Sequence, residues 1–143
     1  MIALETAPSD TKAMKSALVV TGDTAFSQET YLYSDTSCST KTWTNKEGKT
    51  NVVIGDASGS DYKVTYASST ITLSPGNSTA ETFFEAWYKT QGVTVDLTVG
   101  MDTTYGAGDD TYKNLINVTS TTFKMGSKSD YPSSVSTTEY TKQ

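Results

Sequence analysis

The stretch Val93–Val99, VTVDLTV, alternates apolar and polar residues without a break. Successive side chains of a β-strand point to opposite faces, so a period of two predicts a strand with one buried face and one wet face. Asp61–Ala67 repeats the pattern, with Tyr62, Val64 and Tyr66 on one face. Apolar, Tyr- and Thr-rich runs predict further strands at Leu18–Val20, Ala25–Tyr33, Lys41–Thr44, Val52–Ile54, Thr70–Leu73, Leu115–Val118, Thr121–Met125 and Val135–Thr141.

Turn residues separate these runs. Asn45–Gly48 predicts a turn between two short strands, Gly55–Asp61 predicts another, and Thr103–Tyr112 is expected to be a loop. The segment Asn77–Gly92 departs from the period of two, because its aromatic residues recur at helical spacing. Ser78 and Glu81 match a capping box, and Gly92 can end the helix. We expect one short helix near residues 79–90.

Composition favours an antiparallel β protein. Hydrophobic residues make up 35% of the 143 residues and charged residues 19%, and Thr, Ser and nine Tyr fill much of the rest. Thr is β-branched and suits a half-exposed pleated surface. The length predicts a single domain over residues 1–143, and the pattern predicts about eight strands with one short inserted helix. A barrel and a sandwich both satisfy this pattern.

The basic residues exclude several functions. There is no His and no Arg, all eleven basic residues are Lys, and the net charge is −5. Nucleic acid and anionic membranes are therefore not expected partners. Without His, no His-based triad, His-ligated zinc site or His proton shuttle can form. We predict no enzyme activity, cofactor or metal site, and a paired-carboxylate glycosidase is the least implausible exception. No apolar run approaches the ~20 residues of a transmembrane helix.

Two acidic loops are candidate calcium-binding sites. Asp56 and Asp61 flank one Gly- and Ser-rich turn, and Asp109 and Asp110 follow another. Ca²⁺ takes several oxygen ligands from a flexible loop, but neither loop has the full spacing of a calcium-binding loop. The same residues are common in hairpin turns, which is the preferred interpretation.

Three motifs together indicate a family resemblance. They are YSDTSCST before a Gly-containing hairpin, TITLSP before the helix, and the tail TSTTFKMGSKSDYPSSVSTTEYTKQ. In this combination the chain resembles small lipocalin-like β-barrel proteins found among bacterial secreted proteins and lipoproteins. The resemblance implies an antiparallel, calycin-type barrel and a location outside the cytoplasm, at the cell surface, in the periplasm or secreted.

The resemblance also bears on Cys38, the single cysteine. Such proteins often carry a first-strand cysteine after a Gly-x-Trp motif, which could bridge to the cysteine after the YSD turn. Here no such motif precedes Ile2, and Met1 stands about where the partner would fall. The first strand is then trimmed or atypical, or Cys38 is unpaired.

Aromatic residues on the predicted strands are the candidate binding residues. A barrel lined with Tyr and Trp could hold a small apolar ligand, with Tyr hydroxyls fixing its orientation. The alternatives are that these side chains fill the core, or that an exposed Tyr- and Thr-rich face binds glycans or proteins, as in an adhesin-like or structural module. The helix could cover the ligand as a lid or pack against the barrel. The oligomeric state is open. The candidate residues are Tyr31, Tyr33, Trp43, Tyr62, Tyr66 and Trp87.

Overall fold

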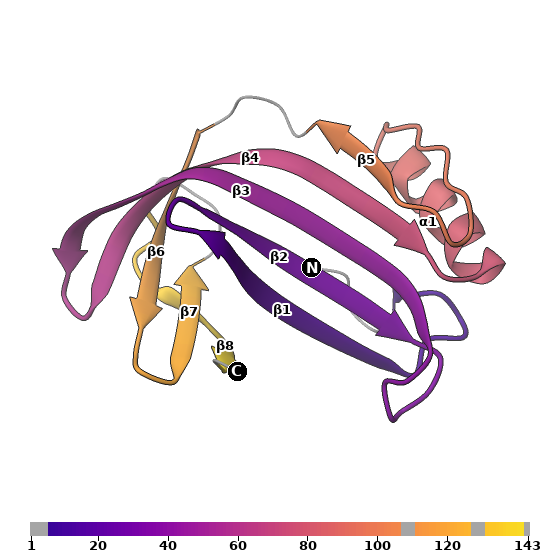
Figure 1. Cartoon of the computed structure of the whole chain (residues 1–143), viewed down its shortest axis with the longest axis horizontal. Helices are drawn as coiled ribbons and strands as arrows, with labels where there is room; N and C mark the ends of the chain where they lie inside the picture. The colour runs from indigo at the N-terminus through magenta and orange to yellow at the C-terminus, as the bar shows by residue number, and fades with distance from the viewer. Residues whose placement is uncertain (1–5, 107–110, 127–130, 142–143) are drawn as a thin grey trace. The chain divides into compact units, whose positions relative to one another are not determined.

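The computed structural model describes residues 6–106, 111–126 and 131–141. Within them lie one helix and eight strands (Figure 1). The helix is α1 (Ser78–Thr90), and the strands are β1 (Ala13–Gly22), β2 (Ala25–Tyr33), β3 (Lys41–Ser58), β4 (Asp61–Pro75), β5 (Thr103–Gly106), β6 (Thr111–Val118), β7 (Thr122–Gly126) and β8 (Val135–Thr141). This confirms the predicted all-β, barrel-like class with one short inserted helix.

The hydrogen-bonded order of the sheet is β1-β2-β3-β4-β6-β7-β8, and β5 pairs with β4. The chain groups into two compact units: unit 1 comprises residues 1–17, 28–47 and 70–106, and unit 2 comprises residues 18–27, 48–69 and 107–143. The long strand β4 contributes to both. Its C-terminal half pairs antiparallel with β5, as in Leu73 opposite Thr103, and its N-terminal half pairs antiparallel with β6, as in Val64 opposite Asn114.

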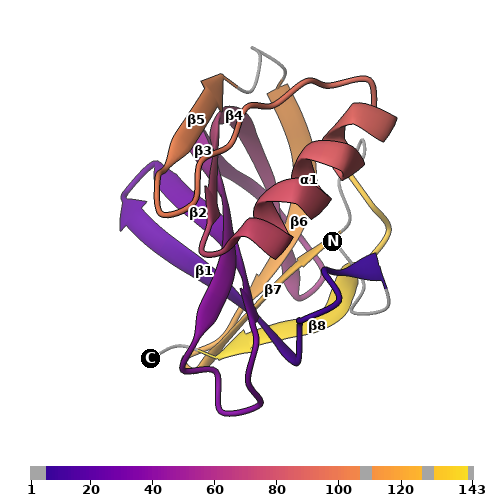
Figure 2. The ribbon, with the colours of Figure 1, turned by 90° about the vertical axis from the view of Figure 1, so that its right-hand side faces the viewer.

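The core of unit 1 forms where α1 packs on the sheet. Trp43 of β3 and Phe84 of α1 stack with ring centroids 3.7 Å apart and planes 15° from parallel. Both rings are essentially inaccessible to solvent, at 1% and 0% exposure. Figure 2 shows α1 beside the end of β4 and beside β5. The remaining buried members of this cluster are Leu32, Leu73, Ala80, Val95 and Leu97.

The helix prediction is confirmed, but its cap differs from the expected one. Asn77, not Ser78, is the N-cap, and its side-chain oxygen accepts a hydrogen bond from the Ala80 amide at 2.9 Å. An N-cap side chain satisfies one of the free amides of the first turn, and Asn performs this role as well as Ser. At the other end Gly92 has a φ of +77°, the left-handed conformation in which a helix commonly ends.

The prediction of a strand at Val93–Val99 is wrong, although the alternation correctly marks burial. Val95 and Leu97 are buried in the core of unit 1 and Asp96 between them is exposed, but residues 93–98 do not form a strand. The backbone amides of this segment bind side-chain oxygens, not the backbone of a neighbouring strand. The Leu97 amide donates to Glu85 Oε1 of α1 at 2.9 Å, and the Asp96 amide donates to the Tyr105 hydroxyl at 3.2 Å.

The predicted turn at Asn45–Gly48 is also wrong, because β3 continues through it without interruption. Lys49 is buried within the strand, and Asn51, at +53°, is the one residue of β3 with a positive φ. Asn tolerates this left-handed conformation better than most residues, so one irregular residue keeps the strand continuous. The expected loop at Thr103–Tyr112 likewise contains β5 and the start of β6.

The core of unit 2 combines apolar and polar side chains. Phe26, Val64, Tyr66, Ile116 and Met125 form its buried cluster. Phe26 meets Tyr66 edge-on, with ring centroids 5.8 Å apart. The register of β6 with β7 places Ile116 opposite Met125, which brings two of these side chains to one face.

Candidate functional site

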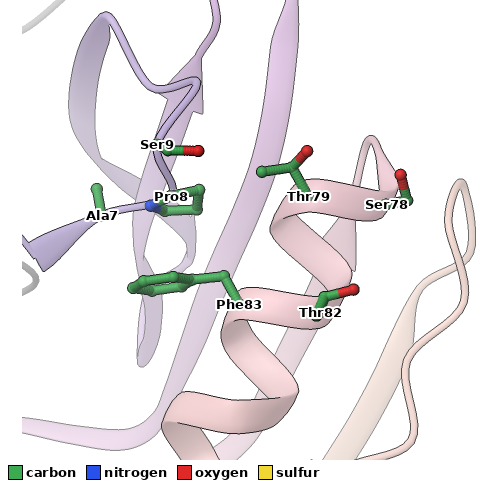
Figure 3. Close-up of a pocket in the computed structure, with 7 residues that line it drawn as sticks. All are labelled: Ala7, Pro8, Ser9, Ser78, Thr79, Thr82 and Phe83. Atoms are coloured by element: carbon green, nitrogen blue, oxygen red, sulfur yellow. The ribbon is translucent and has the colours of Figure 1, made fainter.

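A hollow of about 610 Å³ lies in unit 1 between the segment at residues 7–9 and the first half of α1. Figure 3 shows its two walls: the Phe83 ring extends from the helix toward Pro8 and Ala7, and Ser9 faces Thr79. Ser78 and Thr82 complete the lining, with hydroxyls directed away from the Phe83 side. The described lining therefore has an apolar part and a hydroxyl-bearing part, and none of its seven residues is ionisable.

The wall at residues 7–9 is anchored at several points. Ala7 packs against the core of unit 1. Asp10 accepts a hydrogen bond from the Asn77 side chain at 2.7 Å, which ties this segment to the start of α1. The Pro8 carbonyl accepts from the Thr11 amide at 2.9 Å, and the Lys12 amide donates to the Tyr33 carbonyl at 2.7 Å. The hollow is therefore formed by two fixed walls, which reduces the ordering cost of binding.

The tryptophans predicted as binding residues lie on the helix side of unit 1. Trp43 stacks on Phe84 in the core, so its ring is not available to a ligand. Trp87 is half-buried on α1, where its ring meets Tyr88 edge-on at 4.8 Å between centroids. Neither lines the hollow, whose only aromatic residue among those described is Phe83.

Tyr31 and Tyr33 lie on the other face of β2 from Leu32, because side chains alternate along a strand. Lysines cover both rings: Lys41 Nζ is 4.3 Å from the Tyr31 ring centroid, and Lys15 Nζ is 5.7 Å from that of Tyr33. Cation–π contacts of this kind order the aromatic side chains and occupy the ring faces that a ligand would use.

The remaining predicted tyrosines belong to unit 2. Tyr66 is 2% exposed and packs in the core, whereas Tyr62, four residues earlier on the same face of β4, is 45% exposed. The six predicted residues are thus distributed over the helix side of unit 1, the opposite face of β2 and unit 2. Within unit 1, the structure does not bring them together at the hollow.

Unit 2 holds a buried lysine that the sequence did not single out. Lys49 is 2% exposed, and its Nζ donates a hydrogen bond to Ser68 Oγ at 3.1 Å. The same Nζ lies 5.5 Å from the centroid of the Tyr66 ring. Asn114 donates to the Tyr66 hydroxyl at 3.3 Å and to the Gly126 carbonyl at 3.1 Å. A buried ammonium is costly unless hydrogen bonds satisfy it. Because these groups bind one another, we interpret the cluster as polar core structure.

The loop that carries Cys38 is organised by Asp35. Its carboxylate accepts hydrogen bonds from the amides of Ser39 and Thr40, at 3.1 Å and 2.6 Å, and from the Ser37 hydroxyl at 2.5 Å. These bonds hold the pKa of Asp35 well below its ordinary value. Cys38 is half-buried, unpaired within the described residues, and has a φ of +57°. The proposed partner position at Met1 lies outside the described residues.

The acidic loops form no metal site in the part of the chain that the structure describes. Among those residues, no three or more Asp, Glu, Cys or His side chains lie close enough together to hold a metal ion. Asp61 instead accepts hydrogen bonds from Asn117 at 2.8 Å and from Ser60 at 3.3 Å. Asp109 and Asp110 lie outside the described residues. No helix among those described is long and apolar enough to cross a membrane.

Tyr31 gives a prediction for alkaline pH. Burial, together with a hydrogen bond donated to Glu29, raises its pKa to about 12. Since an unfolded tyrosine ionises near 10, this contribution to stability is complete below pH ~10 and is lost as the pH rises through about 12. We expect an absorbance titration at 295 nm to show a late-ionising tyrosine that Tyr31→Phe removes. In Glu29→Gln, Tyr31 should ionise earlier; an unchanged late phase in both variants would contradict the assignment.

No protein-family model matches this chain, and no curated protein matches its sequence. The likeness to lipocalin-like secreted proteins therefore stays a prediction from the motifs. Function has to be argued from the geometry of the chain itself.

Proposed function

We propose that this protein is a non-enzymatic binding protein that holds a small uncharged ligand in the hollow between residues 7–9 and α1. The observation that carries the proposal is the lining of the hollow. Ala7, Pro8 and Phe83 offer an apolar wall, and Ser9 and Thr79 offer hydroxyl groups from the two facing walls. None of the described lining residues is ionisable. Binding pockets typically combine an apolar surface with a few polar groups that orient the ligand.

The chemistry of these walls favours a ligand with one apolar face and several hydroxyl groups. A neutral sugar ring has this character, because its C–H face can lie against an aromatic ring while its hydroxyls exchange hydrogen bonds with Ser and Thr. A purely apolar ligand would leave the Ser and Thr hydroxyls unpaired, which costs free energy. A charged ligand would find no opposite charge among the described residues of the lining. The protein would act outside the cytoplasm, in keeping with its low content of charged residues.

Ligand titrations followed by NMR test this proposal. Neutral monosaccharides and an uncharged hydrophobic dye are added separately, and amide shifts are monitored along α1 and at residues 7–9. We expect a sugar to perturb Ser9, Thr79 and Phe83 selectively. Thr79→Tyr fills the hollow and should weaken binding at least tenfold, whereas Thr90→Tyr, on the same helix but outside the lining, should leave it unchanged. Equal affinity in both variants, or shifts elsewhere only, would overturn the proposal.

A further inference from the structure

Two buried polar atoms of β3 have no hydrogen-bond partner among the described residues. They are the indole nitrogen Nε1 of Trp43 and the side-chain oxygen Oδ1 of Asn45, both in unit 1. Nearly all buried polar groups in proteins bind either the protein or an internal water, because a buried group without a partner costs free energy. These two atoms therefore indicate a bound molecule in the core of unit 1.

The two atoms belong to one face of β3. Trp43 and Asn45 are two positions apart in the strand, and side chains at this spacing point to the same side. This is the side that α1 covers, since Trp43 stacks there on Phe84. The hydroxyl of Thr42 is also buried without a partner among the described residues, but it belongs to the opposite face. Trp43 and Asn45 are thus the pair that can share one bound molecule.

The spacing of the pair suits a single small bridge. Cα atoms two positions apart in a strand are separated by roughly 6.8 Å, and side chains on one face stand roughly parallel. One hydrogen bond, at about 2.9 Å, is too short for this separation, whereas two in series span about 5.8 Å. The molecule between the two atoms is therefore the size of a water.

The hydrogen-bonding roles of the two atoms are complementary. The indole N–H can only donate, and the Asn45 oxygen can only accept. A water molecule is both acceptor and donor, so it satisfies both atoms at once. A metal ion would face the N–H of Trp43, which has no lone pair to offer, and an apolar ligand would leave both atoms unpaired.

We propose that an internal water molecule binds between Trp43 Nε1 and Asn45 Oδ1, beneath α1. It accepts a hydrogen bond from the indole and donates one to the amide oxygen. The site is separate from the hollow, because neither residue is among those described in its lining. Trp43 is only 1% exposed, so the water leaves only when the structure around it opens locally. It should therefore reside far longer than a surface water.

NMR of the indole protons tests the site directly. The chain has two tryptophans, Trp43 and Trp87, so a Trp87→Phe variant identifies the Trp43 signal. We expect the Trp43 indole proton to show a cross-peak with water whose sign is opposite in NOESY and ROESY spectra. This pattern reports contact with a long-lived water, whereas chemical exchange gives the same sign in both spectra. Absence of the opposite-sign cross-peak in the wild type would overturn the proposal.

Two variants of Asn45 test whether the same water binds this residue. Asn45→Leu removes the acceptor and should weaken the cross-peak at least fivefold. Asn45→Asp is the matched control, because it keeps an oxygen at this position and should retain the cross-peak. Asn45→Ala serves as the acceptor-free variant if leucine prevents folding, which circular dichroism detects. A cross-peak that is equally strong with and without the acceptor, or that both kinds of variant abolish, would contradict a water shared by Trp43 and Asn45.

Discussion

Phe84→Ala is expected to lower the free energy of unfolding by about 3–5 kcal/mol. Phe84 is completely buried, and its ring stacks on Trp43 at the centre of the core of unit 1. Truncation removes apolar surface and also leaves a cavity, because a strand on one side and a helix on the other limit collapse. Urea denaturation followed by Trp fluorescence measures the loss.

Phe83→Ala provides the comparison, since it changes the same residue type one position along the helix. Phe83 is only partly buried and lines the open hollow, so its truncation should cost distinctly less than that of Phe84. Equal losses for the two variants would show that the Trp43–Phe84 stack is not the centre of this core.

Gly76→Ala should be the most disruptive single-methyl change in unit 1, with an expected loss of about 3 kcal/mol. A Cβ at Gly76 would lie 2.5 Å from the Lys41 carbonyl oxygen and 3.1 Å from the Thr42 Cα. Both are backbone atoms, so no side-chain rotation can relieve the contact. The Gly76 amide also donates to the Thr42 carbonyl at 2.7 Å, a bond that any separation would stretch.

Gly106→Ala is the matched control for this change, because a Cβ there meets no atom within 4 Å. Its effect on the free energy of unfolding should stay within about 0.5 kcal/mol. Thermal denaturation of both variants beside the wild type makes the comparison. A tolerated Gly76→Ala would mean that the approach of β3 to the end of β4 is looser than the structure places it.

Local sequence signals predicted the class of the fold well. The helix was visible in the spacing of its aromatic residues and in Gly92, and β2 begins and ends at the predicted residues. The Val93–Val99 prediction was wrong for an instructive reason. Alternation reports which side chains are buried, and Val95 and Leu97 are buried, but it does not report what the backbone binds. Here the partners are side chains of Glu85 and Tyr105.

The hollow could not have been predicted, because its two walls are distant in sequence and carry no motif. Asp10 and Asn77, whose hydrogen bond joins the walls, are 67 positions apart. Ala7, Pro8 and Ser9 form no motif that predicts a binding surface. The helical spacing of aromatic residues in Asn77–Gly92 includes Phe83, but whether such a residue packs in a core or lines a surface depends on the element opposite it. The sequence contains no local signal for that element.

The way residues 93–98 are held has a consequence for how this chain can vary. In a sheet ladder, every residue of a strand depends on the backbone of its neighbour, so insertions shift the register of the whole pair. Here the middle of the segment is bound by two side chains, Glu85 on α1 and Tyr105 on β5. Its ends are held by backbone hydrogen bonds, from the Val93 amide to the Tyr88 carbonyl and from the Met101 amide to the Thr98 carbonyl, both at 3.0 Å. Its length and sequence can change without disturbing any strand, provided that two apolar residues still reach the core. This connection is therefore the part of unit 1 most open to redesign.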